Sequence, residues 1–187
     1  ISNLIKIASN IVIVGAMANN FLAYKKYEIG KSLKETNSEN VVKKILGEAE
    51  VNKCKILIPK DCLVSKSFEG AAVSKDIKFV EKDDIILDVG PKTIKIIEKI
   101  IDNSNTIMWN GPAGYFESKN FALGTNAIAQ KISENTINKS LISVLGGGDT
   151  VSAINQSGLE LSFTHLSTAG GAFLEYLEGK DLPGLSV

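Results

Sequence analysis

Short runs of aliphatic, often β-branched residues alternate along the chain with longer segments in which apolar residues recur at helical spacing. This alternation is typical of α/β proteins, in which helices cover both faces of a mostly parallel sheet. Five of the six runs are apolar enough for buried strands. The runs that predict strands are Ile11–Val14, Lys55–Ile58, Ile85–Asp88, Thr106–Trp109, Leu141–Leu145 and Leu161–Phe163.

The segments between these runs carry helix signals, except in the irregular span from Asp61 to Asp83, where we predict only a short strand, Ile77–Val80. No repeat or composition break divides the chain. We therefore expect one α/β domain over residues 1–187, a Rossmann-like three-layer sandwich. The apolar stripes are Val41, Val42, Ile45, Leu46 and Ala49 behind Ser38 as the expected cap, Ile94, Ile97 and Ile101 behind Pro91, and Phe121, Ala122, Ala129 and Ile132.

All 21 basic residues of the 187-residue chain are lysines, and they balance 21 acidic residues. Because arginine is the usual side chain for bidentate contacts with phosphate or carboxylate, an anion bound here must be met by backbone amides, lysine or a metal ion. The zero formal net charge and the 6% of aromatic residues argue against a nucleic-acid partner.

No apolar run is long enough to cross a membrane and no secretory signal opens the sequence, so we expect a cytoplasmic protein without a membrane partner. In that compartment Cys54 and Cys62 are expected to be buried thiols. The glycosylation patterns at Asn138 and Asn155 are then chance matches. A single histidine, His165, does not allow a Cys/His zinc site.

Ligands of open parallel sheets bind beyond the carboxyl ends of the strands, so the strand-to-helix junctions are the candidate sites. The strongest junction is the run Gly146-Gly147-Gly148-Asp149-Thr150. Its glycines let backbone amides approach an anion at a helix start, and Asp149 can hold Mg²⁺ beside a phosphate. The alternative is a tight turn in which Asp149 caps the helix.

Three further junctions have unusual compositions. Ser167-Thr168-Ala169-Gly170-Gly171 predicts a second amide nest on a neighbouring strand, with capping by Ser167 or Thr168 as the alternative. The segment from Trp109 to Glu117 predicts a rigid turn that carries the polar groups of Asn110 and Glu117. The small residues of Val14-Gly15-Ala16-Met17 suit a flat ligand, or equally close packing of a helix on the sheet.

Several common motifs are incomplete. The run Gly30-Lys31-Ser32 ends like a nucleotide P-loop, but Lys25 occupies the position of the required first glycine. Neither glycine-rich junction spells the dinucleotide fingerprint, which disfavours a dehydrogenase. His165, alone beside a strand end, is more typical of a structural than of a catalytic histidine.

Taken together, these segments closely resemble the phosphoglycerate kinase family, in the family's order and spacing across essentially the whole chain. The matching runs are Gly15-Ala16-Met17-Ala18 with Phe21, Ile29–Leu33, Leu87–Pro91, Trp109–Glu117, Gly146–Thr150 and Ser167–Ala172, with Leu174-Glu175 and Glu178-Gly179-Lys180 following.

The resemblance implies the C-terminal, nucleotide-binding half of a two-domain glycolytic kinase that transfers a phosphoryl group between MgATP and 3-phosphoglycerate. It implies that Gly147, Gly148 and Thr150 contact nucleotide phosphates, that Asp149 holds Mg²⁺, and that Asn110 reaches the phosphate region. Glu117 would bind the ribose, and Gly15, Ala16 and Leu87 would line the adenine site. Gly170 and Gly171 would offer amides to the phosphoryl group in transfer.

The chain also departs from the family pattern. Val14, Ala16 and Ala169 stand where the family commonly has glycine, and a lysine motif expected just before Ile1 is absent. The resemblance further implies that the domain holding 3-phosphoglycerate is not in this chain, so we expect a monomer that binds Mg-nucleotide weakly and is inactive alone. A non-catalytic nucleotide-binding or scaffold module is the alternative.

Overall fold

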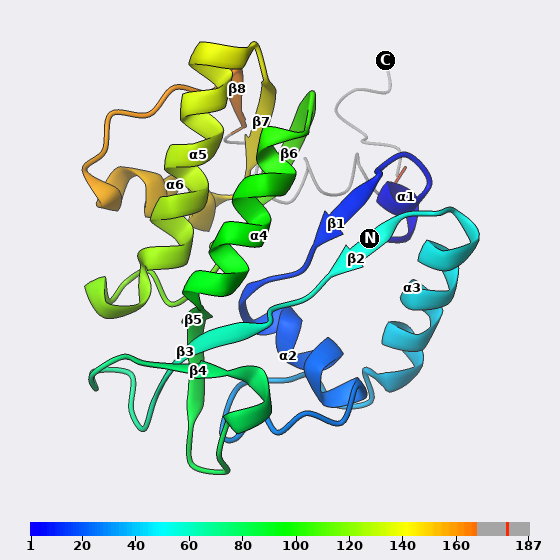
Figure 1. The fold of residues 1–187 in the computed structure, drawn as a ribbon, viewed down its shortest axis with the longest axis vertical. Helices are drawn as coiled ribbons and strands as arrows, with labels where there is room; N and C mark the ends of the chain where they lie inside the picture. The colour runs from blue at the N-terminus through cyan, green and yellow to red at the C-terminus, as the bar shows by residue number, and fades with distance from the viewer. Residues whose placement is uncertain (168–178, 180–187) are drawn as a thin grey trace, which may run out of the picture.

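The computed structural model describes residues 1–167 and residue 179, and Figure 1 shows the path of the chain. Its elements in chain order are α1 (Ser2–Ile5), β1 (Asn10–Val12), α2 (Gly15–Tyr24), α3 (Glu39–Val51), β2 (Lys55–Leu57), β3 (Asp61–Ser65), β4 (Val73–Asp76), the 3₁₀ turn η1 (Ile77–Phe79), β5 (Ile85–Val89), α4 (Pro91–Asp102), β6 (Thr106–Asn110), the 3₁₀ turn η2 (Lys119–Phe121), α5 (Leu123–Lys139), β7 (Ile142–Gly146), α6 (Gly148–Ser157) and β8 (His165–Ser167).

The strands form three small sheets. β1 pairs with β2, and β6, β7 and β8 pair in that order, all in parallel. The third sheet, β4-β3-β5, is antiparallel. The α/β class and the mostly parallel pairing are confirmed, although β5 pairs with an antiparallel neighbour that the sequence pattern does not reveal.

The largest apolar core joins the sheets to the helices. It packs Ile97 and Ile101 of α4 against Ile128 and Ile132 of α5 and against Leu145 of β7. Figure 1 shows α4 and α5 running together past β6 and β7. Residues of β1 and β2 also pack against this core, so the two parallel sheets share one apolar interior.

Both cysteines are buried and free, as predicted. Burial is the main cause that raises the pKa of the Cys62 thiol to about 12, and the negative charge of Asp61 adds to it. No helix in the described part of the chain combines the length and the apolar character that a membrane span requires.

The predicted strand Leu161–Phe163 is wrong, because the strand lies at His165–Ser167. The backbone N–H groups just before this strand donate to side-chain hydroxyls. The Ser162 N–H donates to Ser133 Oγ at 2.8 Å, and the Thr164 N–H donates to Ser143 Oγ at 3.0 Å. Since these groups are already bonded to side chains, pairing with β7 begins only at His165.

The predicted strand Ile77–Val80 is also wrong, since Ile77–Phe79 is a 3₁₀ turn in which the Lys78 N–H donates to Asp76 Oδ1 at 3.2 Å. The strands of this span lie on either side of a stretch rich in Ser, Lys and Gly, at Asp61–Ser65 and Val73–Asp76. They pair with each other over four positions. The irregular excursion is therefore an antiparallel extension of β5.

Predicted helix starts agree with the structure in position. Pro91 is the first residue of α4, and Ser38 is the N-cap residue of α3. The Ser38 side chain is no cap, however, because its Oγ donates to the Glu35 carbonyl at 3.2 Å instead of accepting from the helix.

Asp61 caps α4 from a different element. Its buried carboxylate, 3% exposed, accepts hydrogen bonds from the N–H groups of Lys92 and Thr93, each at 2.8 Å, and from the Thr93 hydroxyl at 2.7 Å. The N-cap residue, Gly90, has no side chain, and a Cβ there would overlap the Asp61 carboxyl group. β3 and α4 are thus joined through one carboxylate.

We predict that Asp61→Asn lowers the free energy of unfolding by about 2 kcal/mol, because an amide keeps one acceptor oxygen and turns a donor toward the helix N–H groups. Urea unfolding at pH 7 measures the change. Asp76→Asn is the comparison: this half-buried carboxylate on the same sheet accepts one backbone N–H instead of two, so its loss should cost less than half as much. Equal losses would contradict the capping role of Asp61.

Candidate functional site

The carboxyl ends of β6, β7 and β8 lie level with one another. In the parallel register Asn110 is opposite Gly146, and Gly146 is opposite Ser167. Three of the four predicted junctions therefore leave the sheet side by side. The continuation after Ser167, which includes the predicted residues Gly170 and Gly171, lies outside the described residues.

The glycine run after β7 forms the start of α6. Gly147 is the N-cap residue with φ +94°, a conformation that favours glycine, and a Cβ there would lie 2.6 Å from Asn110 Oδ1. Gly148 is exposed, with space around its Cα. No side chain caps α6 among the described residues, so the helix presents its first N–H groups at the end of the sheet.

Asp149 is exposed in the first turn of α6, one residue beyond Gly148. The alternative in which it caps the helix is therefore wrong, because the N-cap position belongs to Gly147. An exposed carboxylate beside N–H groups is a suitable ligand for a divalent cation that also contacts a bound phosphate.

Thr150 joins this helix to the neighbouring loop. Its side chain is fully buried, and its Oγ1 accepts a hydrogen bond from the Gly111 N–H at 2.7 Å. This bond places Asn110 against the glycine run. The loop that begins there, residues 110–117, is called the site loop below.

Backbone hydrogen bonds fix the site loop to three more elements. The Gly15 N–H, at the start of α2, donates to the Ala113 carbonyl at 3.2 Å, and the Ala113 N–H donates to Thr125 Oγ1 of α5 at 3.0 Å. The Tyr115 N–H donates to the Leu87 carbonyl of β5 at 2.7 Å. The loop thereby brings the starts of α2, α5 and α6 and the end of β5 together.

The two ends of the site loop are held as well. The Trp109 indole N–H donates to the Gly111 carbonyl at 2.7 Å. At the other end Gln156 Nε2 of α6 donates to the Glu117 carbonyl at 3.4 Å. The backbone of Glu117 is thereby attached to α6, while its side chain is exposed. The segment that the sequence predicts to turn is thus held by hydrogen bonds at both ends.

The predicted residues of the fourth junction lie at the α2 start. Gly15 has φ +61° and is half-buried, Ala16 is exposed, and Leu87 of β5 is buried. A Cβ on Gly15 would lie 3.1 Å from the Pro112 carbonyl oxygen. The close approach at this junction is therefore to the site loop, whereas the sequence interpretation places the helix against the sheet.

Sequence reasoning missed the supports of the site. Thr125 and Gln156 are ordinary helix residues in the pattern and become identifiable only through their contacts. The same holds for Phe68, whose ring packs edge-on against Tyr115 with centroids 5.2 Å apart. His165 is an exposed residue of β8.

The one cluster of carboxylates with metal-ligand spacing in the described residues lies elsewhere, at Glu81, Asp83 and Asp84. Lysines occupy it, since Lys66 and Lys75 each approach a carboxylate oxygen of Asp84 to 2.8 Å. Burial acts to raise the pKa of Asp84, but these hydrogen bonds outweigh it and lower the pKa to about 2. The cluster is an ion-pair network that joins β3 and β4 to the turn before β5.

Comparisons with known proteins agree along the whole chain. A family model described as phosphoglycerate kinase matches residues 1–180. The phosphoglycerate kinase of Agrobacterium fabrum is 44% identical over 187 residues, which is 99% of this chain and 47% of that protein. That of Zymomonas mobilis is 44% identical over the same shares. The chain spans about half the length of the curated relatives it matches.

Solved structures show the same match. The phosphoglycerate kinase of Coxiella burnetii superposes with a TM-score of 0.90 at 37% identity, over 95% of this chain and 46% of that one. The phosphoglycerate kinase of Pyrococcus horikoshii gives a TM-score of 0.77 at 27% identity, over 98% and 46% of the two chains.

The two glycines at the start of α6 should respond differently to alanine. We predict that Gly147→Ala lowers the free energy of unfolding by about 1–2 kcal/mol, because φ +94° and the contact with Asn110 both oppose a Cβ. Gly148→Ala, with open space and helical geometry, should stay within about 0.5 kcal/mol of the wild type. Urea unfolding of both variants tests this, and equal effects would contradict the geometry.

Proposed function

The chain belongs to the phosphoglycerate kinase family, and we propose that it supplies the Mg-nucleotide site for phosphoryl transfer between ATP and 3-phosphoglycerate, with ADP and 1,3-bisphosphoglycerate as products. We propose residues 1–187 as the nucleotide-binding domain. The acid substrate would then be held by residues outside them, consistent with a chain that spans about half of its relatives. The activity is proposed to be cytoplasmic and the chain a monomer.

The observation that carries the proposal is the hydrogen bond from the Gly111 N–H to Thr150. It sets the polar end of the site loop beside an uncapped helix start, so that amide donors and a carboxylate face the same space. Phosphoryl transfer depends on positioning and on neutralising charge rather than on covalent help from the protein. A chain without arginine can meet those needs with backbone amides and a metal ion.

Mg²⁺ suits the residues present. It commonly takes one or two protein carboxylates and completes its shell with substrate phosphates and water, and the exposed Asp149 supplies one such ligand. A bound ion there would neutralise phosphate charge. Asp149 is the residue we propose to hold it.

The other predicted site residues are proposed to contact the rest of the nucleotide and the transferred group. We propose that the amides of Gly147 and Gly148, with Thr150, contact the phosphates, and that Asn110 reaches the same region. Glu117 is proposed to bind the ribose hydroxyls. Gly15, Ala16 and Leu87 are proposed to line the base, and Gly170 and Gly171 to offer amides to the transferred group.

Calorimetric titration of the chain with MgADP tests the proposal. We expect binding in the wild type and a loss of about tenfold in affinity in Asp149→Asn, because the amide is a poorer Mg²⁺ ligand. Glu117→Ala should weaken binding about fivefold through lost hydrogen bonds to the sugar.

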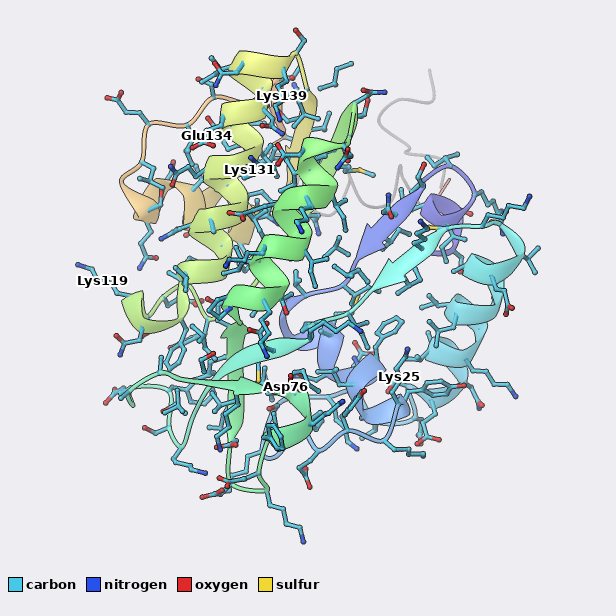
Figure 2. The ribbon with its side chains drawn as sticks, viewed as in Figure 1. Lys25, Asp76, Lys119, Lys131, Glu134 and Lys139 are labelled. Atoms are coloured by element: carbon cyan, nitrogen blue, oxygen red, sulfur yellow. The ribbon has the colours of Figure 1, made fainter. Side chains whose placement is uncertain are left out.

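Glu134→Gln is the matched control for charge. Glu134 is exposed on α5, where it bonds Gln130, and Figure 2 shows it along the helix beyond Lys131, away from Lys119 near the site loop. The affinity of the Glu134→Gln variant for MgADP should equal that of the wild type. Heats that neither Asp149→Asn nor Glu117→Ala changes would overturn this assignment of the site.

A further inference from the structure

Asp88 is a buried carboxylate that none of the proposed nucleotide contacts uses. It lies near the end of β5 and is 2% exposed. Its Oδ1 accepts a hydrogen bond from the Val89 N–H and its Oδ2 one from the Gly124 N–H, both at 2.8 Å. Among the ion pairs of the described residues none includes Asp88, so backbone donors alone compensate its charge.

The bond to Gly124 caps α5. Gly124 is the second residue of the helix, whose N-cap residue, Ala122, forms no side-chain cap. A carboxylate at this position satisfies a helix N–H group and faces the positive end of the helix dipole. β5 therefore provides through Asp88 the cap that the local sequence of α5 lacks.

Two glycines enclose the same carboxyl group. A Cβ on Gly114 of the site loop would overlap Asp88 Oδ1, and so would a Cβ on Gly124. The site loop thus packs against one side of the carboxyl group and α5 against the other. Next to it the Leu87 carbonyl accepts from Tyr115, and Thr125 in the first turn of α5 accepts from Ala113.

We propose that Asp88 is a positioning residue for the nucleotide site: its carboxyl group sets the spacing between α5 and the site loop, and thereby the placement of Asn110 and Glu117. The role rests on the proposed function, because it acts through residues assigned there to the nucleotide. Asp88 itself does not touch the ligand.

The ionisation of Asp88 falls near neutral pH. Burial raises its pKa to about 7, against hydrogen bonds from Gly124, Val89 and Leu123 that favour the charged form. Because the pKa is raised in the folded state, the contribution of this group to stability is complete below about pH 4 and is lost as the pH rises through 7. The charged carboxylate accepts hydrogen bonds at both oxygens. The capping bond to Gly124 therefore becomes stronger as the pH rises, although the free energy of unfolding falls.

Other titratable groups lie on the elements packed around Asp88, and the pH dependence due to Asp88 must be separated from theirs. None of them is among the causes that shift the pKa of Asp88. The titratable side chains on the elements packed around it are Tyr24 of α2, Asp61 and Cys62 of β3, Tyr115 and Glu117 of the site loop, and Lys131, Glu134 and Lys139 of α5.

The test compares Asp88→Asn with Asp61→Asn. Both aspartates are buried, and both cap a helix whose own N-cap residue provides no side-chain acceptor, but only Asp88 contacts the site loop. Calorimetric titration of the chain with MgADP at pH 8 should show about a tenfold loss of affinity for Asp88→Asn and less than a twofold change for Asp61→Asn. Both variants should lower the urea midpoint.

Titrations with MgADP at pH values from 6 to 8 separate the positioning role from a purely structural one, which would not make the affinity depend on the ionisation of Asp88. The affinity of Asp61→Asn relative to that of Asp88→Asn should rise with pH and level off above pH 7, since only the first variant retains the Asp88 carboxyl group. A constant ratio, or equal affinities of the two variants at pH 8, would overturn the positioning role. Wild-type protein that gives no heat with MgADP would overturn the proposed function itself.

If Asp88→Asn does not fold, Gly114→Ala takes its place. This variant crowds the same carboxyl group from the loop side and leaves the bond to α5 in place. It should also weaken MgADP binding about tenfold and change the fluorescence of Trp109, the single tryptophan, which bonds the site loop at Gly111. Unchanged affinity in folded Gly114→Ala would overturn the proposal.

Discussion

The candidate site depends on the hydrogen bonds that the backbone N–H groups of the site loop donate to neighbouring elements. The bonds from Gly111 to Thr150, from Ala113 to Thr125 and from Tyr115 to Leu87 join it to α6, α5 and β5. Each partner belongs to a different part of the sequence, so the loop has its shape only once the domain is folded. An arrangement of this kind is preorganised, which is what phosphoryl transfer asks of a protein.

Helix N-termini at this end of the domain are stabilised by carboxylates from other elements. Asp61 of β3 caps α4, and Asp88 of β5 caps α5, where the local N-cap residues, Gly90 and Ala122, provide no acceptor. By contrast, α6 keeps its start open. The two capped helix starts thus serve the architecture, whereas the first N–H groups of α6 remain available for the ligand proposed above.

Local signals allowed part of this structure to be predicted. The parallel strands β1, β2, β6 and β7, the start of α4 at Pro91 and the glycine run at the start of α6 all follow from short-range patterns. The antiparallel pairing of β5 and the shift of the last strand to His165 do not. They depend on partners distant in sequence, such as the hydroxyls of Ser133 and Ser143.

The residues of the site divide in the same way. Gly147, Asn110 and Glu117 could be identified because unusual residue types follow strands in sequence, and the structure brings the first two into contact. Thr125 and Asp88 could not, because a threonine inside a helix or an aspartate after Leu87 has no special local pattern. Their part in the site consists of contacts with loop residues at least 12 positions away in the sequence, Ala113 for Thr125 and Gly114 for Asp88.

The packing around Asp88 also restricts which substitutions the neighbouring positions can accept. A side chain at either Gly114 or Gly124 meets the carboxyl group, so neither glycine can change while an aspartate stands at position 88 unless the backbone moves. A shorter residue at position 88 would not free either glycine, because a Cβ on Gly114 would still lie 2.7 Å from the Cβ at position 88 and one on Gly124 would lie 2.5 Å from Val89 Cγ2. It would also leave α5 without its cap. We therefore expect a substitution at any one of the three positions to be destabilising on its own, and the effects of combined substitutions to depend on one another rather than to add.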